Sequence, residues 1–267
     1  MSPLALTRPA PTPPGQGPED DIHLTLRDHL VELRKRLMWA VLFLSLGFGA
    51  SWNWSKEIFH FLMRPVFAAL PDGEKALHFS SSVEPFVIYL KVALYAGLFL
   101  SLPLILWQLW AFIAPGLYRR ERRAVLPFVA TATLCFVAGA AFCYVFILPA
   151  AFDFLIHSAG PDITPLLMMD DQLGLVMMLL IAFGIIFEMP LILTFLGMIG
   201  IVDTKFLVKY RRHAIVVNTI IAAVVTPTGD PFNLALMAVP MILCYELGIV
   251  GVWIFGRKRK QDPLVPA

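Results

Sequence analysis

Long apolar runs separated by short polar segments set the pattern of this chain. Four runs, at about 38–55, 86–113, 124–148 and 172–199, approach or exceed the length that a helix needs to cross roughly 30 Å of hydrocarbon. A shorter run of about 13 residues, 213–225, would form a helix of roughly 20 Å, and a sixth run covers 232–255. The pattern therefore predicts an all-α membrane protein with six transmembrane helices. The fifth helix requires a locally thinner bilayer or a covering neighbour.

Two further segments have helical character without spanning the membrane. In LTLRDHLVELRKRL the leucines fall on one helical stripe, which predicts an amphipathic helix that lies at the membrane surface and leads directly into the first span. The segment 56–84 is apolar but is interrupted by Arg64 and Pro65, so we expect a short helix along the outer interface. Pro149 is expected to end the third span.

Positive charge divides unevenly between alternate polar segments. One set of segments carries 17 of the 21 Lys and Arg residues and the other carries 3, while Lys91 lies within an apolar run. Because positive loops stay on the cytoplasmic side, this asymmetry predicts a multi-pass protein of the cytoplasmic membrane with both termini inside. Lys91 lies near the outer end of its span and is expected to extend its ammonium toward the outer interface.

Composition supports a membrane protein and limits its chemistry. The chain is 58% hydrophobic and 15% charged, and its mean hydropathy is +0.75. Residues 1–21 contain six prolines and predict a disordered cytoplasmic tail, residues 22–256 form the membrane domain, and 257–267 form a basic cytoplasmic tail. The three cysteines lie in apolar runs without metal-ligand spacing, so no metal, disulfide or other cofactor is expected. No hydrolase, metalloprotease or phosphate-binding motif is present, which argues against an enzyme.

Carboxylates inside the membrane are the first candidates for function. Glu188 lies in the apolar stretch FGIIFEMPLILTF, where a charge costs about 2.5–3.5 kcal/mol on insertion scales. It could contact a translocating substrate or a partner helix, or it could be a protonated side chain bonded to a neighbouring helix near the break at Pro190. Glu246, nearer the inner end of its span, allows the same two interpretations. An alternative function is a secondary transporter or channel that uses Glu188 as an ion or proton site, although no internal repeat supports it.

Two further glutamates lie in cytoplasmic segments. Asp28, Glu32 and Arg36 share one flank of the amphipathic helix, which predicts an intrahelical Glu–Arg pair or, alternatively, a receptor carboxylate for a basic ligand. Glu121 is the only acid in a loop with four arginines and could simply neutralise them. Spacing alone favours the structural interpretation of both residues.

Six motifs in order resemble the TatC family, the multispanning subunits of the twin-arginine protein translocase. They cover about residues 22–255 and read HLVELRKRL, VEPFVIYLKVAL, LPLILWQLWAFIAPGLYRRERR, FEMPLIL, YRRHAIVV and TPTGDPFNLALMAVPMILCYELG. The resemblance implies a six-helix bundle shaped like a cupped hand, with short spans five and six. It also implies a receptor for twin-arginine signal peptides and a core subunit of the Sec-independent translocase, which exports folded proteins and draws on the proton-motive force.

The resemblance also assigns roles to individual residues. It implies that Glu32 and Glu121 bind the signal peptide, because two arginines favour planar carboxylate partners. The other residues that it associates with this recognition are Arg34, Gln108 and Phe112. Those that it associates with an intramembrane polar or partner contact are Glu188, Thr226, Pro227 and Asp230, to which the sequence position adds Glu246. The turn TPTGDP is a residue longer than the turn that the resemblance leads us to expect, so Asp230 corresponds less closely than the two glutamates.

The implied partners follow from the same resemblance. They are TatA-like or TatB-like single-span subunits, twin-arginine signal peptides of folded precursors, and membrane lipid, within a multimeric complex that binds no nucleic acid.

Overall fold

The computed structural model describes residues 26–70, 76–113, 125–158, 160, 166–226 and 230–256. Within these ranges every regular element is a helix, apart from one isolated β-bridge between His78 and Met168. The tails at 1–21 and 257–267, Glu121 and Pro227 lie outside the described residues. The predictions made for them therefore stay predictions.

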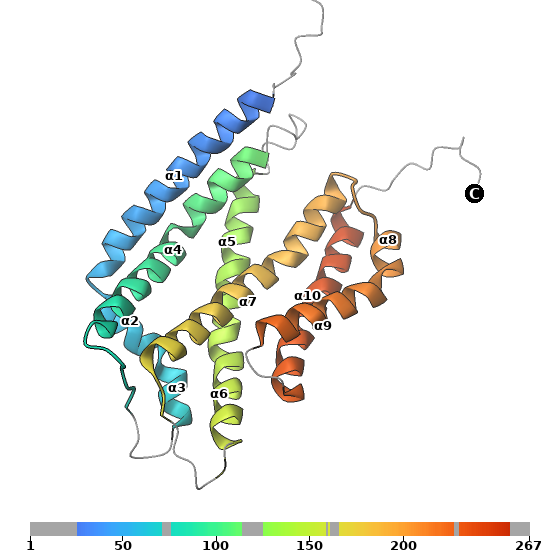
Figure 1. Cartoon of the computed structure of the whole chain (residues 1–267). Helices are drawn as coiled ribbons and strands as arrows, with labels where there is room; N and C mark the ends of the chain where they lie inside the picture. The colour runs from blue at the N-terminus through green and yellow to red at the C-terminus, as the bar shows by residue number, and fades with distance from the viewer. Residues whose placement is uncertain are drawn as a thin grey trace, which may run out of the picture.

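The first helix continues from the amphipathic segment into the apolar run without interruption, which confirms that the two are directly connected. That the amphipathic part lies at the membrane surface stays a prediction. The first helix is α1 (Leu26–Trp52), and α2 (Ser55–Leu62) and α3 (Arg64–Ala69) follow after a bend of 88°. These two short helices occupy the segment predicted to lie along the interface. The next helix, α4 (Glu84–Ile113), runs back beside α1 along its whole length (Figure 1).

The third apolar run is longer than the sequence predicted. We expected Pro149 to end it, but α5 (Val125–Phe142) continues through a π-helical turn (Cys143–Ile147) into α6 (Leu148–His157). A proline is tolerated in the first turn of a helix, where its missing N–H is not needed. The wider π-turn before Pro149 gives room for its ring. The prediction that the span ends at Pro149 is therefore wrong.

The last four helices are α7 (Met169–Met198), α8 (Thr204–Lys209), α9 (Arg211–Val225) and α10 (Pro231–Phe255). With 15 residues, α9 is about 22 Å long, which confirms that the fifth predicted helix is short. The resemblance also implied that the sixth span is short. This prediction is wrong, because α10 has 25 residues. Asp230 caps its N-terminus directly after the turn, and the helix continues through Pro240.

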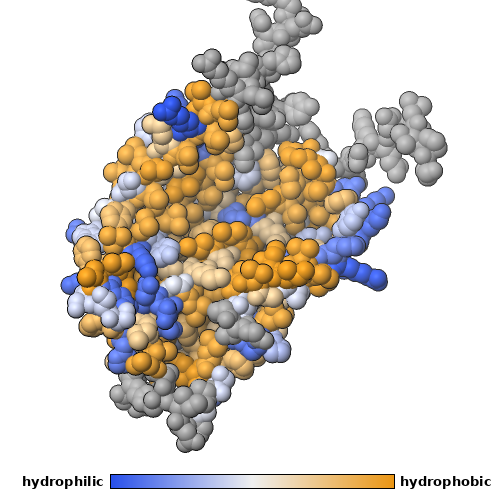
Figure 2. Space-filling model, in the orientation of Figure 1, coloured by the Kyte–Doolittle hydropathy of each residue, from blue (hydrophilic) through white to orange (hydrophobic). Residues whose placement is uncertain are grey.

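One of the two 30-residue helices, α7, lies at the centre of the bundle. Packed between α5 and α10, α7 contributes the fully buried side chains Leu173, Val176 and Phe183. Large apolar side chains such as Leu134 and Trp253 are exposed instead, and Figure 2 shows hydrophobic residues over most of the visible face. An apolar exterior around an apolar core is the arrangement expected of a bundle in lipid.

Length and composition identify how many helices could cross a membrane. In the described part of the chain four helical segments qualify, and a fifth is added if α1 and the bent α2–α3 pair count as one span. The fold is thus an all-helical, multi-pass membrane protein. A sixth crossing would have to be made by α9, which is shorter than the hydrocarbon thickness.

Candidate functional site

The start of α1 and the end of α4 lie together and bring three of the predicted site residues to the same level along the helix axes. The two helices touch backbone to backbone at Gly47 and Gly97, where a methyl group on Gly47 would lie 2.5 Å from the Gly97 carbonyl oxygen. Glu32 lies 15 residues before Gly47, and Phe112 lies 15 residues after Gly97 on the antiparallel helix. Both residues are therefore about 22 Å from the Gly47–Gly97 contact in the same direction. Gln108 lies one helical turn before Phe112 on α4.

An aromatic cluster fixes the end of α4 at this level. The Trp110 ring lies 4.1 Å from Phe128 on α5 and 4.8 Å from Phe195 on α7, measured between ring centroids. Edge-on aromatic pairs of this kind add about 0.5–1.5 kcal/mol beyond the area that they bury. The helix segment that carries Gln108 and Phe112, both half-buried, is therefore held by two neighbouring helices.

Glu32 forms the intrahelical ion pair that its spacing predicted. Arg36 donates from Nη2 at 2.6 Å and from Nε at 3.0 Å, and both bonds end on Oε1 of Glu32. Pairs of this type stabilise a helix by only about 0.3–0.5 kcal/mol. The second carboxylate oxygen receives neither bond, and the carboxylate as a whole can accept about four. The ion pair therefore leaves Glu32 able to bind a further guanidinium, while Arg34 is exposed beside it.

Glu188 is the most deeply buried carboxylate in the described residues. It is 9% exposed on α7, faces α5 near Cys135 and Phe136, and its Oε1 has no hydrogen-bond partner among the described residues. A methyl group on Gly139 would lie 2.4 Å from the Phe183 carbonyl oxygen, so α5 and α7 approach closely here. An unpaired polar atom in an apolar bundle is costly, and a partner that supplies a hydrogen bond would relieve that cost.

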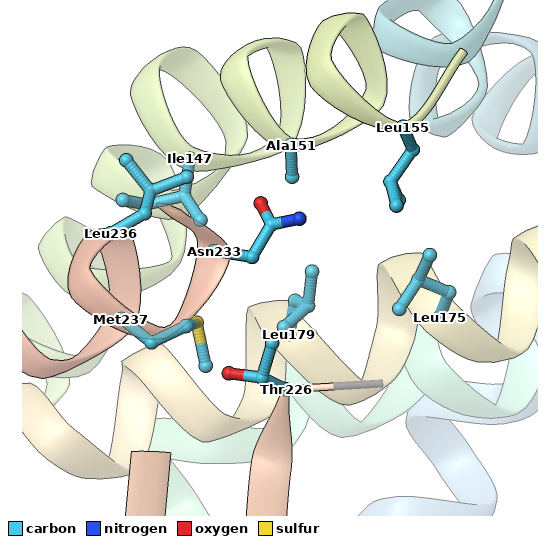
Figure 3. A pocket seen from close by; sticks show the side chains of 9 residues that line it. All are labelled: Ile147, Ala151, Leu155, Leu175, Leu179, Thr226, Asn233, Leu236 and Met237. Carbon is cyan, nitrogen blue, oxygen red and sulfur yellow. The ribbon is translucent and has the colours of Figure 1, made fainter. Parts of the chain in front are cut away.

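The C-terminal end of α9 and the first turns of α10 form a small cavity with the π-helical turn, α6 and α7 (Figure 3). Its volume of about 20 Å³ exceeds the space of about 10–15 Å³ that one water needs. Seven of the nine lining residues are apolar, and the polar ones are Thr226 and Asn233, whose amide points into the cavity. Thr226 donates from Oγ1 to the Ala222 carbonyl at 2.7 Å. Asp230 lies beside this cavity and accepts from Asn233 N at 2.7 Å.

The contacts of Asn233 were not predicted from the sequence. The signal that could have identified them is the position of Asn233 three residues after Asp230, at the start of an apolar run, which is the spacing of a helix cap and the third helical residue. The Asp230 side chain also accepts from Asn233 Nδ2 at 2.9 Å, so the cap fixes the orientation of that amide.

Two ion pairs between helices were not predicted. Glu246, expected as a membrane polar site, binds Arg211 through both oxygens and so fixes the start of α9 to the C-terminal half of α10. Lys91 binds Asp170 at 2.5 Å and joins α4 to the first turn of α7, where the sequence predicted only an extended side chain. Both pairs join residues far apart in the chain, and each is partly exposed.

The chain is similar to known proteins over most of its length. The family model described as Sec-independent protein translocase protein (TatC) matches residues 28–240. The chain is 40% identical over 240 residues to the Sec-independent protein translocase protein TatC of Koribacter versatilis (strain Ellin345), covering 89% of this chain and 88% of that protein. It is 35% identical over 240 residues to the protein of the same name from Aquifex aeolicus (strain VF5), covering 89% of this chain and 98% of that one.

A solved structure is similar over most of the chain. The crystal structure of the twin-arginine translocase receptor TatC superposes with a TM-score of 0.73 at 35% identity, and the match covers 86% of this chain and 100% of that one.

Proposed function

Because this chain belongs to the TatC family of Sec-independent protein translocase proteins, we propose that it is the membrane receptor for twin-arginine signal peptides. In this function it is a non-enzymatic core subunit of the translocase that exports folded proteins across the cytoplasmic membrane. The observation that carries the proposal is the level shared by Glu32, Gln108 and Phe112 at the inner end of α1 and α4. Peptide recognition at this end precedes any membrane crossing.

The proposed binding step is the pairing of signal arginines with carboxylates. Glu32 keeps Arg36 on Oε1 and accepts a signal guanidinium on Oε2, while Glu121, eight residues beyond the end of α4, binds the second arginine. Arginine is favoured over lysine because its planar donors match a carboxylate. The Gln108 amide donates hydrogen bonds to the peptide backbone or accepts them from it. Phe112 contacts apolar residues of the signal.

The proposed topology has six crossings with both termini in the cytoplasm. The crossings are α1, α4, the continuous segment from α5 to α6, α7, α9 and α10. The distribution of 17 basic residues on one side against 3 on the other supports this orientation. As the fifth crossing, α9 would be short by about 8 Å of the hydrocarbon thickness, so the bilayer beside it would be thin.

The proposed partners are TatA-like or TatB-like single-span subunits in a multimeric complex. Glu188 offers a hydrogen-bonding atom without a partner in the described residues, which a polar side chain of a partner helix could satisfy. Thr226 follows the last residue of α9 and Asp230 caps the start of α10; with Pro227, which lies between them in the sequence, they form the other proposed contact. Glu246 is assigned a lesser part, since Arg211 already occupies both of its oxygens.

Photocrosslinking of a twin-arginine signal peptide to the full translocase in membranes tests the receptor function. Loss of one hydrogen bond to a charged group weakens the binding free energy by about 1.5–3 kcal/mol. Glu32→Gln and Glu121→Gln should therefore each reduce crosslinking at limiting peptide by about tenfold or more. Glu57→Gln is the matched control, because Glu57 is an exposed glutamate just beyond the opposite end of α1. A signal with two lysines should crosslink as weakly as the variants.

Equal crosslinking by the wild type, both variants and the lysine signal would contradict the proposed recognition. The alternative of a secondary transporter or channel gains nothing from the family assignment.

A further inference from the structure

The corner where α8 meets α9 has an exposed surface to which no function has been assigned. It consists of Lys205, Phe206, Lys209, Tyr210 and Arg212, all of them exposed, and is called the α8–α9 corner below. Figure 2 shows hydrophilic residues gathered at the right-hand edge, where Figure 1 places α8 and the start of α9. Basic and aromatic side chains are thus interleaved on one short stretch of chain.

The aromatic rings of the corner form a continuous row. Phe206 and Tyr210 have ring centroids 4.6 Å apart, and Tyr210 lies 5.5 Å from the His213 ring. Lys209 Nζ lies 5.9 Å from the centre of the Tyr210 ring, within the range of a cation–π contact. Aromatic residues with one polar edge favour the boundary between lipid and water, so the row indicates the depth at which the corner lies.

The positive charges of the corner are not neutralised by the carboxylates described around them. Arg211 is bound to Glu246, and Asp203 accepts from the Phe206 N–H as the cap of α8. No ion pair within the described ranges includes Lys205, Lys209 or Arg212. Arg212 also lies in the first turn of α9, where a cation opposes the helix dipole. An anion beside this turn would offset the repulsion among the three cations and the unfavourable interaction of Arg212 with the dipole of α9.

The corner is anchored rather than loose. Leu207, on the opposite face of α8, is 5% exposed and packs with Tyr245 and Ile249 of α10. The Tyr245 hydroxyl donates to the Leu207 carbonyl at 2.9 Å, and the Arg211–Glu246 pair holds the next turn. Because α10 fixes both halves of the corner, the backbone that carries the basic side chains of the corner is held in place. Ligand binding therefore requires little ordering of this backbone.

The surface next to the corner is apolar. Val216, Val217 and Ile220 continue along α9 with exposures of 58%, 51% and 58%. A ligand that fits the whole surface therefore has an anionic group at the corner and a hydrocarbon part along α9. An acidic protein segment would match the charges but would leave the apolar strip uncovered.

We propose that the α8–α9 corner binds an anionic phospholipid, with its phosphate between Lys205, Lys209 and Arg212 and its acyl chains along α9. Basic pockets beside membrane helices bind anionic headgroups in this way. A lipid held here would set the depth of α9, the helix that is too short for an unperturbed bilayer. The site shares no residue with the proposed signal-peptide site, whose described members Glu32, Arg34, Gln108 and Phe112 lie on α1 and α4.

Native mass spectrometry of the full chain, released from nanodiscs, tests this site. In nanodiscs of mixed phosphatidylglycerol and phosphatidylcholine, the wild type should retain phosphatidylglycerol selectively. The triple variant Lys205→Gln, Lys209→Gln, Arg212→Gln should lose affinity by about fivefold for each charge removed. Lys209→Gln alone should show one such step, whereas Lys35→Gln, an exposed lysine on α1, should show none.

Controls separate a lipid site from misfolding and from a simple anion site. The variant Lys205→Arg with Lys209→Arg keeps the charges and should keep the lipid, and equal helical circular dichroism shows that each protein is folded. The proposal is overturned if the triple variant and the wild type retain equal phosphatidylglycerol, or if phosphatidylcholine is retained equally. Complete displacement by soluble glycerol 3-phosphate would also overturn it, because a headgroup alone would then account for the binding.

Discussion

Replacement of Gly47 by alanine should separate α1 from α4 and disturb the proposed receptor site. A methyl group at Gly47 would lie 2.5 Å from the Gly97 carbonyl oxygen and 3.1 Å from its carbon. Those atoms are backbone, so neither can rotate away, and the helices must move apart. Gly49, two residues further along α1, is the matched control, because a methyl group there meets no atom within 4 Å.

The difference between the two variants isolates the steric cost. Both gain the same helix propensity, at most about 1 kcal/mol in water, so this gain cancels in the comparison. Overpacking of a tight contact costs about 1–3 kcal/mol. At roughly 2–4 °C per kcal/mol for a chain of comparable size, Gly47→Ala should unfold about 2–12 °C below Gly49→Ala.

The assay has a stability readout and a geometric one. Thermal unfolding in one detergent gives the difference in midpoint. Spin labels near the start of α1 and the end of α4 give the distance between the two helices. Gly47→Ala should broaden or lengthen that distance and weaken signal-peptide crosslinking, while Gly49→Ala should change neither. Identical midpoints and distances for the two variants would refute the close backbone contact and the register derived from it.

Three further outcomes are expected. Lys91→Gln and Asp170→Asn should show a coupling energy below about 1 kcal/mol in a double-mutant cycle of unfolding, because the pair is half-exposed; a coupling of several kcal/mol would contradict this estimate. Glu188→Gln should keep a single-span partner bound in co-purification and Glu188→Leu should release it, since only glutamine retains hydrogen-bonding atoms; equal retention would remove Glu188 from the partner contact. Insertion of four apolar residues in α9 should reduce export of a folded substrate but leave signal crosslinking unchanged, and undiminished export would contradict a role for its short length.

Local chemistry in the sequence determined the elements and one side-chain contact. The positions of the long helices follow from the apolar runs, because a helix in hydrocarbon must be apolar over a fixed length. The Glu32–Arg36 pair follows from its spacing of four residues, which puts both side chains on one helix flank. The motifs were sufficient to identify the family, which the comparisons confirm.

Contacts between distant segments were decided only by the tertiary structure. Arg211 and Glu246 are 35 residues apart, and Lys91 and Asp170 are 79 residues apart, so no local pattern could pair them. The continuation of the helix past Pro149 runs through a π-helical turn, which no local sequence pattern predicted. The level shared by Glu32 and Phe112 depends on where two glycines meet. Apolar periodicity fixes which residues enter the membrane, whereas register is a property of two helices together and requires the packed structure.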